Sequence, residues 1–278
     1  MHKDLNANYL SGSIPKAWKT LPLVHLSMLA NNIGGLIPME IAEIVTLKHL
    51  VLTDNQLEGP IPPELGKLTR LKTLVLSGNN FTGTLPATFA NLKDMTDFRI
   101  AGTSFSGEIP DFLGNWTKLV QLDMRGTSME GPIPSTIFHL KNLTILRVSD
   151  LKGPNMPFPD LRDMNSMQQL ELRNCMNNGS IASNIVEIMP GLMKLDLSFN
   201  RLTGDIQGLQ EIPSLRNMYL TNNSLTGHIP AWITNVKHNF DLSYNNFTGP
   251  SQTVCQISNL NKISSYSSEE NQSVSWCL

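Results

Sequence analysis

Apolar residues return at fixed offsets along most of the chain, and each group is followed by a polar residue and a turn. One clean copy consists of Leu71, Leu74, Leu76, Asn79, Phe81, Gly83, Leu85 and Pro86. With Asn79 taken as the key position, the equivalents lie 22 to 25 residues apart at Asn8, Asn31, Asn55, Asn79, Thr103, Thr127, Leu151, Cys175, Asn200, Asn223 and Asn245. A fixed period in this range is typical of solenoids, so the sequence predicts about eleven stacked repeats.

The residues before the key position predict a short strand. Leu50 and Leu52 alternate with Val51, which suits a strand with one buried face, so each repeat adds one strand to a parallel sheet. An asparagine at the key position can satisfy backbone groups that turn inward at a buried bend. We therefore expect the stacked repeats to form an asparagine ladder.

The residues after the key position predict a corner and a short helix. Gly59 permits unusual dihedral angles and Pro62 ends hydrogen-bonded structure on the outer side, so this segment should turn the chain. A short helix or 3₁₀ turn is expected over 63–68. The predicted fold is an α/β solenoid with a parallel concave β-sheet and short helical or 3₁₀ turns on the convex side.

The repeated phrase resembles the plant-specific leucine-rich repeat, whose L-x-G-x-I-P signature appears here as Leu57, Gly59, Ile61 and Pro62. The resemblance covers about residues 5–250 and rests on about ten near-copies. The irregular segments 95–100, 147–154, 157–161 and 172–175 further resemble the ectodomains of plant receptor-like kinases that carry a malectin-like domain after the repeats. This resemblance implies a non-catalytic extracellular module, with any kinase domain, leader and membrane span outside the chain.

Charge and hydropathy exclude some classes of partner, and the extent of the repeats gives the domain organisation. The net charge is −2 and charged residues make up 16%, which gives no global signal for nucleic acid. No apolar run approaches the roughly 20 residues of a membrane span, so this segment is not expected to contact the membrane. Residues 1–250 are interpreted as one solenoid whose amino-terminal cap is missing. Residues 251–278 are interpreted as a carboxy-terminal cap or a linker to a following domain.

Seven Asn-x-Ser/Thr sequons suggest passage through the secretory pathway, although a repeat rich in asparagine produces some of them by itself. They begin at Asn80, Asn115, Asn142, Asn178, Asn222, Asn246 and Asn271. Cys175 occupies a key position and should be a small buried residue. Cys255 and Cys277 are placed to form a disulfide that ties down a cap, or Cys277 pairs outside this chain.

The residues two and four positions before the key position should face the concave side, because they alternate with buried leucines. The candidate ligand-binding residues in these columns are Arg99, Asp123, Arg125, Arg147, Glu171, Arg173 and Tyr219. Neighbouring strands lie about 4.8 Å apart, so the charged residues can pair laterally as a surface charge ladder. We expect Arg99 and Arg147 to be neutralised by Asp123 and Glu171. Arg125 and Arg173 would then be the arginines available to a ligand.

The repeats that carry these arginines also depart from the consensus. Thr103, Thr127, Leu151 and Cys175 replace asparagine in the ladder, and residues 153–159 lack the usual turn phrase. Such departures mark functional or strained sites, and drift within a degenerate repeat is an equal alternative. His25 and His49 lie six residues before their key positions and should therefore be on adjacent strands. Two histidines without a third fixed ligand predict no metal site.

No phosphate loop, metal-ligand spacing or nucleophile signature points to an enzyme, and no cofactor is predicted. The leading hypothesis is a recognition module that binds a peptide, a cell-wall oligosaccharide or a co-receptor protein on its concave face. One alternative is a secreted inhibitor of a wall-degrading enzyme, which a coding sequence without a kinase would favour. The other is a structural spacer, which a featureless concave face would favour.

Overall fold

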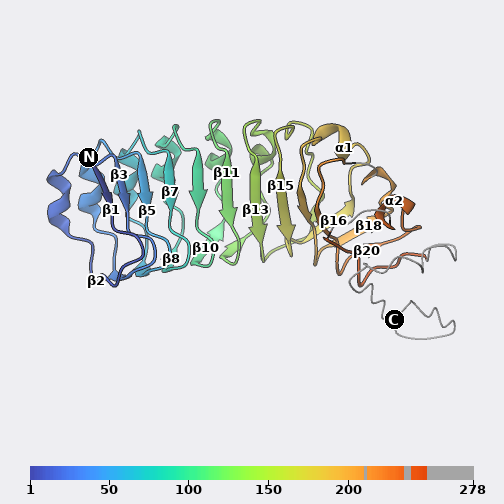
Figure 1. The fold of residues 1–278 in the computed structure, drawn as a ribbon, viewed down its shortest axis with the longest axis horizontal. Coiled ribbons are helices and arrows are strands. Elements are labelled where there is room, and N and C mark those ends of the chain that lie inside the picture. Colours follow the sequence, from blue (N-terminus) through green and yellow to red (C-terminus); the bar gives the residue numbers. More distant parts are fainter. Residues whose placement is uncertain (210–211, 235–238, 249–278) are drawn as a thin grey trace.

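A computed structural model of the chain describes residues 1–209, 212–234 and 239–248. The repeats stack along one axis into an elongated body, with the amino terminus at one end (Figure 1). No helix among the described residues is long and apolar enough to cross a membrane. The predicted solenoid is confirmed.

Eleven short strands, one from each repeat, form a single sheet in which sequential repeats pair in parallel. Its strands are β1 (His2–Asp4), β3 (His25–Ser27), β5 (His49–Val51), β7 (Thr73–Val75), β9 (Asp97–Arg99), β11 (Gln121–Met124), β13 (Ile145–Ser149), β15 (Gln169–Arg173), β17 (Lys194–Asp196), β19 (Asn217–Tyr219) and β21 (Asn239–Asp241). The register keeps equivalent positions opposite each other, so Asp123 pairs with Arg99 on one side and with Arg147 on the other. The exposed face of this sheet is called the concave face below.

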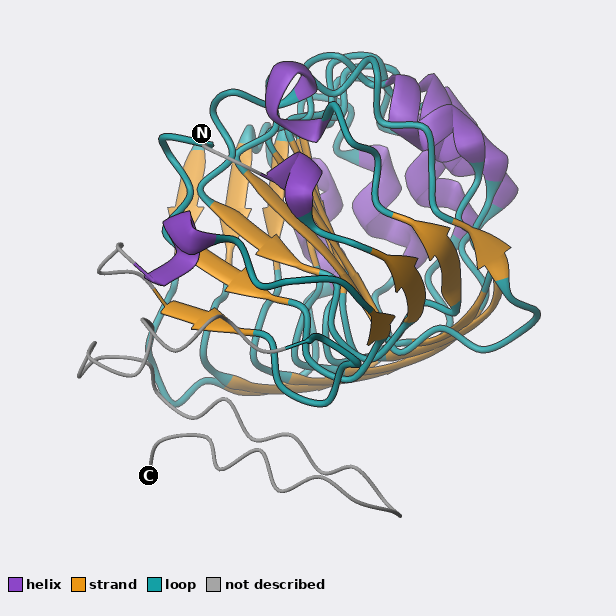
Figure 2. Cartoon of the chain, turned by 90° about the vertical axis from the view of Figure 1, so that its right-hand side faces the viewer, coloured by secondary structure: helices purple, strands orange, loops and turns teal. Residues whose placement is uncertain are grey.

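Short helices lie on the side of the solenoid opposite the large sheet (Figure 2). The 3₁₀ helices are η1 (Lys16–Thr20), η2 (Met39–Glu43), η3 (Pro63–Lys67), η4 (Ala87–Asn91), η5 (Asp111–Asn115), η6 (Ser135–His139) and η7 (Gln207–Leu209). Two single-turn α-helices, α1 (Ile185–Ile188) and α2 (Ala231–Thr234), take the same place in later repeats. A proline with φ between −56° and −70° precedes each of η1 to η6, which presets the chain for the turn.

Two further sheets form the corner after the key position. The first contains β2 (Ser11–Gly12), β4 (Asn32–Gly35), β6 (Gln56–Gly59), β8 (Asn80–Gly83), β10 (Ser104–Glu108) and β12 (Ser128–Glu130). The second contains β14 (Met156–Pro157), β16 (Asn177–Ser180), β18 (Arg201–Gly204) and β20 (Ser224–Leu225). The sequence predicted only a turn here. The two sheets separate at repeat seven, where a single bridge between Glu130 and Lys152 replaces the ladder.

Stacked apolar side chains fill the space between the sheets and the helices. Leucines within and directly after the strands, such as Leu74 and Leu76, are fully buried. Phe81 and Phe105 stack on neighbouring repeats with ring centroids 5.8 Å apart. Trp116 is also fully buried, and its indole N–H donates to the carbonyl of Phe89 at 3.2 Å. This continuous core gives the concave face a rigid support.

The asparagine ladder is present as predicted. The side-chain amide of Asn79 donates to the carbonyls of Leu52, Leu76 and Ser77 at 2.9 to 3.2 Å, and its oxygen accepts from the N–H of Leu57 at 3.0 Å. Asn31, Asn55, Asn200, Asn223 and Asn245 make equivalent bonds. Leu52 and Leu57 belong to the preceding repeat, so the ladder joins successive repeats as well as closing each bend.

Substitutes at the key position keep part of this function. The Thr103 hydroxyl donates to the carbonyl of Ile100 at 2.6 Å. The Cys175 thiol lies 3.3 Å from the carbonyl of Val148, and the residue is 1% exposed, which confirms its expected role as a small buried residue. Burial raises the pKa of the Cys175 thiol far above its usual range, so the native thiol is unreactive.

Candidate functional site

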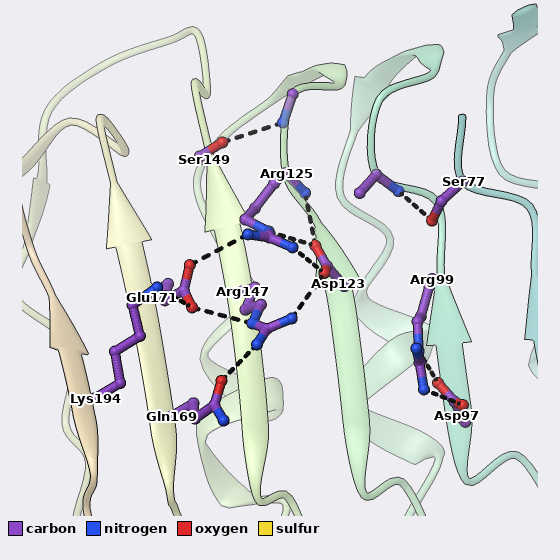
Figure 3. Close-up of polar contacts among 12 residues, drawn as sticks. Ser77, Asp97, Arg99, Asp123, Arg125, Arg147, Ser149, Gln169, Glu171 and Lys194 are labelled. Carbon is purple, nitrogen blue, oxygen red and sulfur yellow. Dashed lines mark hydrogen bonds and ion pairs between the residues drawn. The ribbon is translucent and has the colours of Figure 1, made fainter. Parts of the chain in front are cut away.

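The columns two and four positions before the key residue lie on the concave face, as the alternation of apolar residues predicted. Around β11 to β17 the concave face brings together Asp123, Arg125, Arg147, Glu171 and Lys194, which we call the charge cluster (Figure 3). Lys194 comes from the column six positions before the key residue. Five charged side chains from four adjacent strands therefore meet on one face.

The two carboxylates of the charge cluster are almost fully buried and each is held by several cations. Asp123 accepts two hydrogen bonds from Arg125, at 2.9 and 2.7 Å, and lies 3.5 Å from Arg147. Glu171 lies 2.9 Å from Lys194, 3.0 Å from Arg147 and 3.5 Å from Arg125. Because each carboxylate has more than one cationic partner, the charge cluster is closed on itself.

Two parts of the predicted pairing are wrong. Arg99 does not pair with Asp123; it makes two bonds of 2.8 Å to Asp97, two residues away on the same strand (Figure 3). Arg125 is not available, because hydrogen bonds to Asp123 hold its guanidinium and raise its pKa. Only the expected pairing of Arg147 with Asp123 and Glu171 is found.

Arg173 differs from the other three arginines. It makes no ion pair with any residue that the structure describes, and its guanidinium lies 4.6 Å above the centre of the Phe199 ring. Next to it, Asp150 is held by hydrogen bonds from Ser149 and Asn174. Burial alone would raise the pKa of Asp150, but these bonds and the charge of Arg173 lower it overall. Arg173 is therefore an exposed cation supported by an aromatic ring.

Phe199 occupies a conformation that large side chains rarely adopt. The residue just before each key position has positive φ, and sequence reasoning missed this column although Gly78, Gly102, Gly126 and Asn174 signalled it. Phe199 has φ 60° and is 41% exposed. Left-handed conformation costs a non-glycine residue roughly 1–2 kcal/mol. Tyr244 occupies the equivalent position with φ 54° and is 49% exposed, so this conformation is a feature of the repeat.

A shallow hollow of about 360 Å³ lies on β15 to β21, beside Arg173 and Phe199. Its lining residues are Arg173, Lys194, Asp196, Ser198, Phe199, Tyr219, Thr221 and Asp241. Of the seven predicted ligand-binding residues, Arg173 and Tyr219 line this hollow, four belong to the charge cluster and Arg99 stands apart. Asp196, Phe199 and Asp241 are additional lining residues that were not selected from the sequence.

No sequon of the described residues starts in the concave columns, but Asn222 directly follows Thr221, which lines the hollow. Asn80, Asn115, Asn142, Asn222 and Asn246 are exposed, and Asn178 is half-buried in β16. The Asn142 amide donates to the carbonyl of Thr117 at 2.9 Å. Asn271 and the predicted disulfide partners Cys255 and Cys277 lie outside the described residues.

The described residues contain no group of three metal-ligating side chains with suitable geometry. His2, His25 and His49 stack along the first three strands, with ring centroids 5.7 Å apart in each pair. The His49 ring nitrogen Nδ1 lies 3.0 Å from the hydroxyl of Thr73. Burial, followed by the charges of His25 and nearby lysines, lowers the pKa of His49.

Comparisons with known proteins agree with the repeat assignment. The family profile described as "Leucine Rich repeats (2 copies)" matches residues 45–93, and the profile "Leucine Rich Repeat" matches residues 214–236. A probable LRR receptor-like serine/threonine-protein kinase of Arabidopsis thaliana is 49% identical over 131 residues. That match covers 47% of this chain and 13% of the relative, so the chain corresponds to a small part of the relative's length.

Solved structures of plant receptor kinases share the fold. The Arabidopsis receptor kinase HAESA, in complex with the peptide hormone IDA and the co-receptor SERK1, superimposes with a TM-score of 0.80 at 30% identity. The match covers 92% of this chain and 43% of HAESA. The PEPR1–AtPEP1 structure has a TM-score of 0.76 at 28% identity, covering 88% of this chain and 35% of that one. The chain thus contains leucine-rich repeats, has their solenoid fold and shows homology to part of plant LRR receptor-like kinases.

Proposed function

We propose that the chain is a non-catalytic recognition module of a plant receptor-like kinase, and that it binds a peptide or a co-receptor protein through its concave face. The main support is the contrast between a frame that repeats and a surface that does not. Core apolar residues recur with each turn and the ladder asparagine in most turns, whereas the concave column changes from Val75 through the charge cluster to Tyr219. A rigid frame that presents a different side chain at each step suits recognition.

The position of the sequons supports this choice of face. Of the six sequons of the described residues, Asn80, Asn115, Asn142, Asn178 and Asn246 start away from the residues that line the hollow, and Asn222 borders it beside Thr221, so glycans at the first five would leave the hollow open. Two similar structures concern peptide hormones: HAESA is in complex with the peptide hormone IDA, and RGFR1 is a plant peptide hormone receptor in complex with RGF2. A cell-wall oligosaccharide is a second ligand class for the same face, because the hollow offers Tyr219 next to carboxylate and hydroxyl groups.

The setting of this module forms part of the proposal. The chain faces the extracellular space, residues 1–250 form the recognition solenoid, and residues 251–278 form a cap or a linker to a following domain. The resemblance of segments 95–100, 147–154, 157–161 and 172–175 to one receptor group supports a malectin-like domain as that following domain. Kinase activity would belong to a part of the receptor outside this chain.

A glycan introduced on the concave face tests the proposal. Val51→Asn and Tyr219→Asn each create a sequon on that face, followed by Leu52-Thr53 and Leu220-Thr221 respectively. Wild-type and variant proteins, secreted from plant cells and immobilised, are incubated with the secreted peptide fraction of plant tissue. Retained peptides are measured by mass spectrometry.

We expect at least one peptide to be retained by the wild type and lost from one or both glycan variants. Asn115→Gln, which removes a sequon from the helix side, is the matched control and should retain the same peptide. Equal retention by the wild type and both glycan variants would contradict binding at the concave face. If neither the wild type nor any variant retains a peptide, the alternative function of a structural spacer would be favoured.

A further inference from the structure

Tyr219 lies between two carboxylates on the concave face. The register of β17, β19 and β21 places Asp196, Tyr219 and Asp241 side by side, one on each strand. All three side chains are half-buried and line the hollow. Neighbouring strands are about 4.8 Å apart, so the two aspartates start about 10 Å from each other, with the tyrosine ring in the middle.

In each aspartate, one carboxylate oxygen accepts no hydrogen bond from the residues that the structure describes. Oδ1 of Asp196 accepts from the N–H and hydroxyl of Ser198, at 3.1 and 2.6 Å. Oδ1 of Asp241 is held in the same way by Ser243, at 3.0 and 2.6 Å. Neither aspartate makes an ion pair with a described residue, in contrast to Asp123 and Glu171 in the charge cluster. The serines thus fix each carboxylate while its Oδ2 stays open.

The cations at the edge of the hollow do not neutralise these carboxylates. Lys194 lies 5.8 Å from the Tyr219 ring centre, but its ammonium is 2.9 Å from Glu171 and belongs to the charge cluster. Arg173 is held on the ring of Phe199 at the opposite edge. The hollow therefore has an open acidic row next to an open guanidinium.

The geometry points to a cation subsite: the Asp196–Tyr219–Asp241 row binds the basic side chain of a peptide, and Arg173 pairs with an acidic group of the same peptide. A guanidinium or ammonium above an aromatic ring is attracted by the ring face, and two flanking carboxylates add ion pairs. Arg173 and Tyr219 are two strands apart, about 10 Å, which corresponds to two or three residues of an extended peptide. This inference rests on the proposed recognition function and specifies its ligand.

The test uses a positional-scanning library of acetylated hexapeptides on the immobilised chain. Asn at position 196 or 241 would create a sequon with Ser198 or Ser243, so the variants are built on S198A/S243A. D196N/D241N in that background differs from the background protein by two charges, and the amide oxygens can still accept the backbone N–H groups. R173Q is tested separately.

We expect the wild type and the S198A/S243A background to prefer Arg or Lys at one library position. Replacing that residue by citrulline or norleucine should weaken binding about tenfold, and D196N/D241N should remove the preference while leaving neutral peptides unchanged. R173Q should keep the basic preference and lose a preference for Asp or Glu two or three positions away. A basic preference that survives D196N/D241N, or no basic preference in the wild type, would overturn the cation subsite.

The outcomes separate this inference from the proposed function. Hexapeptides that bind without any basic preference, and are blocked by the glycan at position 51 or 219, would leave the recognition role standing without the cation subsite. Binding of no hexapeptide would also overturn the cation subsite. The plant peptide fraction then decides the recognition role independently.

Discussion

At the scale of single residues, the solenoid depends on a few side chains with obligatory backbone partners. Asn79 is 5% exposed and satisfies four backbone groups, two of which belong to the preceding repeat. Asn80, the next residue, is exposed in β8 and has no such task. Adjacent asparagines therefore have very different structural importance.

Asn79→Ala should destabilise the fold, because each buried backbone group left without a partner costs about 1 to 3 kcal/mol. Asn80→Ala should change the free energy of unfolding by about 0.5 kcal/mol or less. Chemical denaturation of the unglycosylated proteins measures both values. Asn222 is a poorer control although it is exposed, because its φ of 56° would penalise alanine independently of the ladder. Equal denaturation midpoints for the Asn79 and Asn80 variants would contradict the ladder.

The arginines of the concave face should also differ in how much they contribute to stability. Arg125→Ala removes two bonds from the buried carboxylate of Asp123 and should cost about 2 kcal/mol. Arg173→Ala loses an exposed contact with Phe199 and should cost about 0.5–1 kcal/mol. Thermal and chemical unfolding of the two variants gives the comparison. A larger loss of stability for the Arg173 variant would show that the charge cluster is assigned to the wrong arginines.

At the scale of strands and turns, periodicity determined what could be predicted. Leu50 and Leu52 identified the strand and its buried face, and Asn79 identified the ladder. The choice of ion-pair partner was not predictable. Arg99 has one acidic neighbour two residues along its own strand, about 7 Å away, and another across to the next strand, about 5 Å away. A long arginine reaches both, so side-chain packing decides between Asp97 and Asp123.

The second sheet was also missed for a physical reason. Segments such as Gln56–Gly59 contain a glycine with positive φ and few β-branched residues, so their local pattern reads as a turn. They pair as strands because the large sheet has already fixed the spacing between repeats. The hollow was missed because its lining adds Phe199 and Lys194, one and six positions before the key residue, to the two columns selected from the sequence.

The histidine column at the first three strands should make stability depend on pH. Burial and the charges of His25, Lys72, His2 and Lys48 lower the pKa of His49 below its ordinary value of 6.5. The unfolded chain then binds the proton more readily than the folded chain. Stability from His49 is therefore present above about pH 6.5 and declines as pH falls through the lower folded pKa.

His49→Gln should reduce the loss of stability between pH 7 and pH 5, measured as the shift of the denaturation midpoint. His228→Gln is a control at the other end of the solenoid, where the ring lies 3.1 Å from the hydroxyl of Thr248 and is exposed. An unchanged pH dependence in the His49 variant would assign the effect to other groups.

At the scale of the whole molecule, most sequons of the described residues lie away from the face proposed to bind a ligand. Expressed behind a secretory leader in plant or insect cells, the chain should carry glycans at several exposed sequons, with Asn80 and Asn115 among them. Asn178 should be modified less, because it is half-buried and paired within β16 and its neighbours. Glycopeptide mass spectrometry measures the occupancy of each site, and a fully unmodified protein would argue strongly against the extracellular setting.

The ladder also bears on how such a chain changes length during evolution. The Asn79 side chain completes the bend of its own repeat and bonds to Leu52 and Leu57 of the repeat before it. Successive junctions in the first part of the chain are therefore interchangeable, and a duplication or deletion of one whole period regenerates the same junction. Unequal recombination can then lengthen or shorten the receptor surface by one strand at a time while the frame stays intact. The irregular repeat around Leu151 lacks the ladder asparagine and so does not form this interchangeable junction. We therefore expect the repeats before it and the repeats after it to change in number independently.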